Sequence, residues 1–288
     1  MNDQLMNEKR GINKRRRFTI RQRTIAMIIF SLAILLVMIV SGLCIDAEKI
    51  GINLDSKNNT PSLAHWFGTD WLGRDMLSRT LKGLTLSFGV GMLAALSSAI
   101  IALILSLFSS WSKTADYIVT WLIDLFLSVP HIVTLLLISF AVGGGFKGVV
   151  IGLALTHWPS LARLLRAEVL QLKNAEYVSV SLRLGKTRFW IARHHFLPHL
   201  IPQLIVGFIL LFPHAVLHEA AITFLGFGLS TETPAIGIIL SESMRYLSTG
   251  LWWLAFFPGL LLLVMVGIFD LLGRSIQRLI DPFHGQRG

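Results

Sequence analysis

The segment RLGKTRFWIARHHFLPHLIP, residues 183–202, separates two long apolar stretches and carries a Gly-Lys-Thr triplet at 185–187. The same triplet ends the P-loop pattern G-x-x-x-x-G-K-[ST], in which glycine amides curl around phosphates. That pattern needs its first glycine at position 180, where this chain has Val180, a residue without the backbone freedom of glycine. The preceding residues, QLKNAEYVSVSLRL, read as a helix and not as the strand that leads into a P-loop. The segment therefore predicts no nucleotide site and needs another function.

The composition of the whole chain indicates a membrane protein. Of its 288 residues, 53% are hydrophobic and only 15% are charged, whereas a soluble domain has about 25% charged residues. The net charge is +10, but the basic residues occur in short blocks between apolar runs. Short basic blocks between apolar runs are typical of the loops that orient a membrane protein in the bilayer, and not of a nucleic-acid-binding surface. The single cysteine, Cys44, excludes an intrachain disulfide.

Six stretches are long and apolar enough to cross a membrane, which takes about 20 residues in a helix. The first does not resemble a cleaved signal peptide, because its apolar core exceeds the usual ~7–15 residues and no A-x-A site follows. The third contains Asp124 and Pro130. We therefore predict an all-α integral membrane protein with spans at about 24–45, 84–109, 118–142, 148–165, 200–225 and 251–273.

The distribution of Lys and Arg predicts the orientation of these spans. Residues 1–23, the segment 163–199, the C-terminal end and Lys113 together hold 19 of the 26 basic residues. Cytoplasmic loops are the ones enriched in Lys and Arg. We therefore expect both termini and the 163–199 loop to be cytoplasmic, and the segments 46–83 and 226–250 to be external.

The cytoplasmic loop continues a helical pattern beyond the membrane. Apolar residues recur at helical spacing from Leu161 to Leu184, with charged residues between them. Gly185 interrupts the pattern, a second short apolar group starts at Phe189, and Pro198 is expected to end it before the fifth span. Such a basic, amphipathic helix–glycine–helix element is able to occupy a groove on a partner protein.

This loop resembles the EAA loop of ATP-binding-cassette (ABC) importer permeases, in the dipeptide, oligopeptide and nickel group. Aligned on Gly185, the later positions of the pattern fall on His195, Leu197 and Pro198, and Glu176 lies in an E-Y-V form. The E-A-A slot itself holds Ser-Val-Ser at 179–181, which departs from the pattern. The stretches FGTDWLGRDMLSR (67–79), HEAAITFLGFGL (218–229), TPAIGIILSES (233–243) and LLGRSIQRLIDP (271–282) are similar to segments of the same group.

The resemblance covers about residues 24–283 and implies a type I ABC importer permease fold with six transmembrane helices and cytoplasmic coupling helices. It implies a non-catalytic permease subunit in a bacterial cytoplasmic membrane. The expected partners are a related second permease, two ATPase subunits and an external substrate-binding protein, with ATP on the ATPases and no cofactor on this chain. It assigns ATPase coupling to Glu176, Arg183, Gly185, Arg188, His195, Leu197 and Pro198. Peptide, nickel and a metal–chelator complex all remain open as cargo.

Four regions follow from this interpretation. They are a basic cytoplasmic tail at 1–23, a first span with an external amphipathic segment at 24–83, a core permease domain at 84–283 that contains the 163–199 loop, and a short tail at 284–288.

Ionisable residues within spans are functional candidates by default. His214 and His218 lie four residues apart on one helix face, and Glu219 follows. We expect His131, His218 and Glu219 to line a translocation path, with Glu219 near the external mouth. His214 and His218 are also the candidates for a metal site. Together with Glu219 they would suit two alternatives: an integral membrane metal-dependent enzyme or a secondary transporter.

Charged residues outside the path have structural interpretations. Asp116 and Asp124 share one helix face, and both are expected to be structural, with Asp124 paired to a neighbouring arginine. Asp70, Arg74 and Asp75 are expected to form an ion-paired amphipathic helix on the external surface, where the resemblance adds a role facing substrate or binding protein.

Overall fold

The computed structural model describes residues 20–230 and 232–280, so most of the predicted tail 1–23 and all of 284–288 lie outside the described residues. The described chain is helical, with one isolated β-bridge between Thr69 and Asp75. The longer helices are α2 (Ile20–Leu43), α3 (Met76–Ser109), α4 (Lys113–Ser128), α5 (His131–Ala141), α6 (Gly145–Lys173), α9 (Leu197–Phe224) and α11 (Trp253–Ile280). The shorter ones are η1 (Ala47–Ile50), η2 (Leu54–Ser56), α7 (Glu176–Arg183), α8 (Arg188–Ile191), η3 (Ala192–Phe196), α10 (Ile236–Met244) and η4 (Leu247–Thr249).

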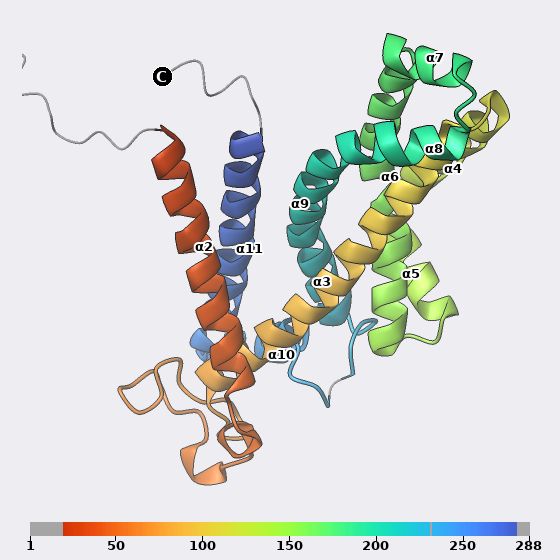
Figure 1. Cartoon of the computed structure of the whole chain (residues 1–288). Coiled ribbons are helices and arrows are strands. Elements are labelled where there is room, and N and C mark those ends of the chain that lie inside the picture. The colour runs from red at the N-terminus through yellow and green to blue at the C-terminus, as the bar shows by residue number, and fades with distance from the viewer. Residues whose placement is uncertain (1–19, 231, 281–288) are drawn as a thin grey trace, which may run out of the picture.

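Five helices within the described residues are long and apolar enough to span a membrane, and the α4–α5 pair makes a sixth if it counts as one span. The start of α2, the end of α11 and the short helices α7 and α8 all lie at one end of the molecule (Figure 1). The loop before α3 and the loop before α10 lie at the opposite end. The six-span prediction is therefore confirmed, with α2 and α3 beginning earlier than expected, at Ile20 and Met76.

The third predicted span, 118–142, is not one helix. α4 and α5 meet at an angle of 100°. Val129 is extended, with φ −97° and ψ 141°, because the ring of a following proline disfavours the helical region for the residue before it. Pro130 then starts α5 as its N-cap residue. The break directs His131, the first residue of α5, towards the middle of the helix assembly.

Helix α3 lies at the centre of the packing. Its buried face is made largely of small residues, including Ala94, Ala95, Ala99 and Ala102, which let helix backbones approach closely in a membrane. Two buried serines on that face bond to α6: Ser98 Oγ donates to the Ala154 carbonyl at 3.0 Å, and Ser106 Oγ to Ala162 at 3.1 Å. The contact of α3 with α6 is therefore fixed in both distance and register.

The expectation that Pro198 ends the helical segment before the fifth span is wrong. Helices α8, η3 and α9 form one uninterrupted stretch, Arg188–Phe224. η3 is a turn of π-helix directly before Leu197, and Pro198 is one of the first residues of α9. Proline lacks an N–H and its ring crowds the preceding turn. A single wider π turn inside an α-helix, although rare, accommodates such a local change. The chain thus runs continuously from the loop into the fifth span.

Three residues that were predicted to be external, Asp70, Arg74 and Asp75, do not lie on an amphipathic helix, contrary to expectation. Asp70 and Arg74 belong to a turn before α3, and Asp75 is the N-cap of α3, accepting a 2.8 Å hydrogen bond from the Ser78 N–H. Asp70 is fully buried and bonds both Arg74 Nε at 2.7 Å and Arg79 Nη1 at 2.8 Å. Its carboxylate fixes the fold of this segment instead of facing solvent.

Candidate functional site

The first candidate site is the loop element formed by α7 and α8. Helix α6 runs past the end of the predicted fourth span to Lys173, and α7 starts two residues later at Glu176. Val178 of α7 is 1% exposed and packs in the same cluster as Val169 and Leu172 of α6 and Ile191 of α8. The element is therefore anchored to α6 and α9 by a hydrophobic base, at the end of the molecule shown at the top of Figure 1.

Gly185 makes the turn between α7 and α8. Its φ is +80°, in the left-handed region that glycine adopts without a Cβ penalty. The N–H of Gly185 donates to the Leu182 carbonyl at 3.0 Å, and the N–H of Lys186 to Ser181 at 3.1 Å. These bonds satisfy the last carbonyls of α7, as in a glycine C-cap. The sequence prediction of a helix–glycine–helix element is confirmed.

The outer surface of the loop element is apolar in part. Val180 is 55% exposed, Leu184 73% and Phe189 66%. Exposed apolar side chains gathered on one short element are candidates for an interaction surface. We call Val180, Leu184 and Phe189 the loop patch.

The other residues assigned to coupling lie around this patch. Glu176 and Arg183 are the first and last residues of α7, and both are exposed. His195 Nε2 lies 2.9 Å from Ser181 Oγ, which ties η3 to α7. Arg188 donates to the Trp111 carbonyl at the α3–α4 turn. Leu197 and Pro198 start α9, so they join the loop element to the fifth span.

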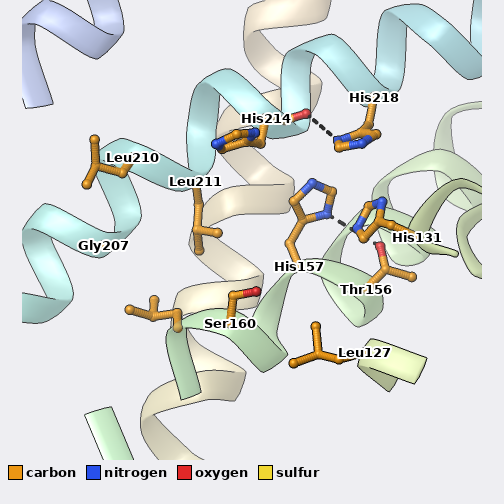
Figure 2. A pocket seen from close by; sticks show the side chains of 11 residues that line it. Leu127, His131, Thr156, His157, Ser160, Gly207, Leu210, Leu211, His214 and His218 are labelled. Carbon is orange, nitrogen blue, oxygen red and sulfur yellow. Dashed lines mark hydrogen bonds between the residues drawn. The ribbon is translucent and has the colours of Figure 1, made fainter. Parts of the chain in front are cut away.

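The second candidate site is a pocket of about 380 Å³ between α4, α5, α6 and α9. Figure 2 shows three imidazole rings gathered at one end of it, from His131 of α5, His157 of α6 and His218 of α9. The ring centroids of His131 lie 4.4 Å from those of both His157 and His218, and the latter two are 5.2 Å apart. We call His131, His157 and His218 the histidine cluster.

Hydrogen bonds orient two of these rings. His157 Nδ1 lies 3.0 Å from the Leu153 carbonyl, and His218 Nδ1 lies 2.8 Å from the His214 carbonyl. A carbonyl oxygen only accepts, so in both rings Nδ1 carries the proton and a neutral ring keeps its lone pair on Nε2. His157 Nε2 and both ring nitrogens of His131 are buried and lack a hydrogen-bond partner among the described residues. Each buried polar group without a hydrogen-bond partner lowers the stability of the folded protein by about 1–3 kcal/mol.

The pocket agrees with the sequence predictions only in part. It brings together His131 and His218, which were predicted to line a path. His157 was not predicted. Ionisable residues inside spans are functional candidates, and this argument, which identified His131 and His218, applies equally to His157 in the fourth span. His214 lines the pocket but is not one of the three residues whose ligand atoms converge.

Glu219 does not lie at a wet external mouth, as expected from its position along the span. It is 0% exposed, beside the core residues Val216 and Ala220, and its Oε1 accepts a 2.9 Å hydrogen bond from Thr223. The side chain is also absent from the pocket lining. His214 and His218 therefore face the pocket while Glu219 does not, since adjacent helix residues point about 100° apart.

Ion pairs account for most of the remaining charged candidates. Arg79 is 4% exposed and bridges Asp70 to Glu242 of α10, with Nη2 2.8 Å from Glu242 Oε2. Asp116 forms a two-pronged pair with Arg166, at 2.6 and 2.9 Å, which confirms its structural interpretation. Asp124 pairs with Arg163 at 2.9 Å.

Comparisons with known proteins agree on one family. Residues 91–283 match the family described as "Binding-protein-dependent transport system inner membrane component". The dipeptide transport system permease protein DppC of Bacillus subtilis is 32% identical over 256 residues, 88% of this chain and 80% of its own length. The oligopeptide permease protein OppC of the same organism is 30% identical over 231 residues, 80% and 75% of the two chains. A probable D,D-dipeptide permease, DdpC of Escherichia coli, is 30% identical over 263 residues, 91% and 88%.

Two solved structures share the fold. An amino acid ABC transporter solved with histidines aligns with a TM-score of 0.54 at 18% identity, over 70% of this chain and 94% of the other. The MetNI methionine ABC transporter, in inward-facing conformations, aligns with a TM-score of 0.56 at 20% identity, over 72% and 98%.

Long apolar helices around a pocket lined by leucines and histidines are the architecture of a multi-pass membrane protein. This chain belongs to the family of inner membrane components of binding-protein-dependent transport systems. It is a permease subunit of an ABC importer, a machine that also comprises ATPase subunits and a substrate-binding protein. Neither the membrane enzyme nor the secondary transporter is favoured by this membership.

Proposed function

We propose that this chain forms half of the translocation pathway of a peptide importer, paired with a related second permease. Two ATPase subunits dock on the α7–α8 elements of the two permeases, on the cytoplasmic side, where both termini also lie. An external binding protein delivers the cargo. Peptide is the first candidate because the relatives compared are named as dipeptide, oligopeptide and D,D-dipeptide permeases.

The observation that carries this proposal is the loop patch on a firmly anchored element. Val180, Leu184 and Phe189 are exposed at an end of the molecule where the basic residues predict cytosol. An apolar helical surface outside the membrane favours burial in a groove of a partner protein. In this family that partner is the ATPase, which makes the Gly-Lys-Thr triplet part of a surface that contacts a nucleotide-binding protein.

The loop element is built to transmit movement into the membrane. α8 continues through η3 into α9 without a break, from Arg188 to Phe224. At about 1.5 Å per residue, this stretch reaches roughly 40 Å from α8 to the level of His218. Closure of the ATPase subunits would therefore displace one end of a continuous helix whose other part lines the pocket.

The coupling role is tested by placing a charge in the loop patch. The complete importer is expressed from its own operon, and the tagged permease is purified with whatever stays bound. Leu184→Asp is expected to lose the ATPase subunits and the ATP hydrolysis that the loaded binding protein stimulates, because a carboxylate resists burial in an apolar groove.

The matched control is Leu63→Asp, which places the same charge on a leucine that is 96% exposed in the external segment. This variant should keep its ATPase subunits. If Leu184→Asp and Leu63→Asp retain equal amounts of ATPase, the α7–α8 element does not form the docking surface.

A further inference from the structure

We propose that the histidine cluster is a transient binding site for a divalent transition-metal ion that crosses the membrane as cargo, bare or held in a chelate with open coordination positions. The inference rests on the proposed function, because it places the site on the path of that importer. It names a cargo chemistry that the peptide permeases among the relatives do not suggest.

Three separate helices supply the ligands. His131, His157 and His218 each offer one ring nitrogen, and these three atoms lie within 4.8 Å of one another. No other group of three or more His, Cys, Asp or Glu side chains within the described residues converges in this way. Nitrogens bound at about 2.0–2.1 Å to one ion lie roughly 3.3 Å apart, so small ring rotations would close the site.

The hydrogen bonds around the cluster match those of metal-binding histidines. A ligating histidine usually donates its second ring N–H to a carbonyl or carboxylate, which fixes the tautomer and aims the other nitrogen at the metal. His157 does so through the Leu153 carbonyl at 3.0 Å, and His218 through the His214 carbonyl at 2.8 Å. Figure 2 shows the His214–His218 bond and the three rings directed towards one another.

The remaining nitrogens need a partner that the described residues do not supply. His157 Nε2 and both ring nitrogens of His131 are buried without a hydrogen bond, and no hydrogen bond joins the three rings. Packing alone does not explain three imidazoles here, since apolar side chains would fill the same space without orphaned nitrogens. A cation bound by one lone pair from each ring would give a partner to His157 Nε2 and to one of the two ring nitrogens of His131.

The ligand chemistry selects the class of ion. Imidazole suits nickel, copper, zinc and iron, whereas magnesium and calcium prefer oxygen ligands. No acidic side chain lines the pocket, which argues against the oxygen-preferring ions. Three protein ligands leave at least one coordination position open for water or for a chelator, as release of a cargo requires.

The site also lies where the transporter would move. His131 begins α5 directly after the 100° bend, and His218 lies on the helix that continues from the α7–α8 element. Displacement of α9 relative to α5 and α6 would separate the ligands. ATPase closure would therefore alter the affinity of the site and release the ion.

The test uses the complete importer, purified with its partner subunits and reconstituted in lipid nanodiscs. Co²⁺ is the probe, because nitrogen coordination gives visible absorption bands, and Ni²⁺ stoichiometry is measured by elemental analysis. His131→Gln, His157→Gln and His218→Gln remove one ligand each. His199→Gln is the matched control, because it removes a histidine of α9 that does not line the pocket.

We expect the wild-type complex to bind Co²⁺ with nitrogen-type bands and His199→Gln to bind equally well. Each cluster variant should bind at least about tenfold more weakly, since even loss of an outer hydrogen-bond partner costs roughly 10–100-fold. Wild-type complex without these bands, or cluster variants that bind like wild type, would overturn the proposal. Co-purification of the ATPase subunits shows whether each variant assembles. If a variant fails to assemble, the presence or absence of Co²⁺ bands in the wild-type complex tests the proposal.

The two proposals fail in different ways. If the ATPase subunits co-purify and peptide-loaded binding protein stimulates ATP hydrolysis, but no ion binds the cluster, the metal inference falls and the peptide importer stands. If no ATPase co-purifies with the wild-type chain, the importer assignment of the loop element falls, whatever the metal measurement shows.

Discussion

At the scale of single residues, Gly185 illustrates how one backbone angle maintains a functional surface. Its φ of +80° closes the turn between α7 and α8, while an added Cβ would meet nothing within 4 Å. The need for glycine is therefore conformational and not steric. In the chain, Val180 of α7 and Leu184, its C-cap residue, precede the turn, and Phe189 of α8 follows it.

Replacement of Gly185 by alanine should strain the turn by about 1–2 kcal/mol, the cost of a left-handed conformation for a residue with a Cβ. We expect the variant to retain less ATPase subunit after purification, with little change in detergent-solubilised thermal stability, because the strain is confined to an exposed turn. Quantitative gel analysis of the purified complex measures the retained ATPase.

Gly267→Ala provides the matched control. Gly267 lies within α11, has no positive φ, and an added Cβ there also meets nothing within 4 Å. Alanine favours a helix over glycine by up to about 1 kcal/mol, so this variant should assemble normally. Equal loss of ATPase in both variants would contradict the conformational role of Gly185.

At the scale of elements, a buried ion-pair network joins the external segment to the helices. Arg79 of α3 bridges Asp70 of the preceding turn and Glu242 of α10. Arg74 adds a second contact to Asp70 at 2.7 Å. The network thus holds α10 against the start of α3 and the turn before it, at the end of the molecule opposite α7.

Arg79→Met should destabilise the protein by about 1–3 kcal/mol, because Asp70 and Glu242 each lose a hydrogen-bond partner while Asp70 keeps Arg74. The apparent unfolding temperature of the purified chain measures this. Arg274→Met is the comparison, since Arg274 forms an exposed pair with Asp270 on α11, worth about 0–1 kcal/mol. Similar unfolding temperatures for the two variants would show that the buried network is not a stabilising element.

At the scale of the whole molecule, the arrangement of the helices makes the orientation testable. Cys44 is the only cysteine in the sequence. It is exposed at the end of α2, and Phe189 of the loop patch lies at the opposite end of the molecule (Figure 1). We predict that Cys44 faces the exterior and the loop patch faces the cytosol.

A membrane-impermeant thiol reagent should therefore label Cys44 from outside intact spheroplasts. Phe189→Cys in a Cys44→Ser background should be labelled only in inverted membrane vesicles. Labelling of Cys44 only in inverted vesicles would reverse the proposed orientation and move the loop patch to the wrong side for an ATPase.

Several features of this protein were determined by the sequence alone. The apolar stretches predicted the spans, and the spacing from Gly185 to Leu197 and Pro198 predicted the loop element and the family. These predictions succeed because the length and hydrophobicity of a span and the position of a glycine turn are local properties. They depend on residues that are contiguous in the sequence and not on tertiary contacts.

Other features were decided only by the tertiary structure. The fully buried Asp70, the continuous helix through Pro198 and the burial of Glu219 depend on which surfaces pack against them. The histidine cluster is the clearest case, because His131, His157 and His218 come from three helices and meet only when a bend of 100° turns α5 towards α6 and α9. A linear pattern records that each histidine lies in a span, but the convergence of their nitrogens is a property of helix packing.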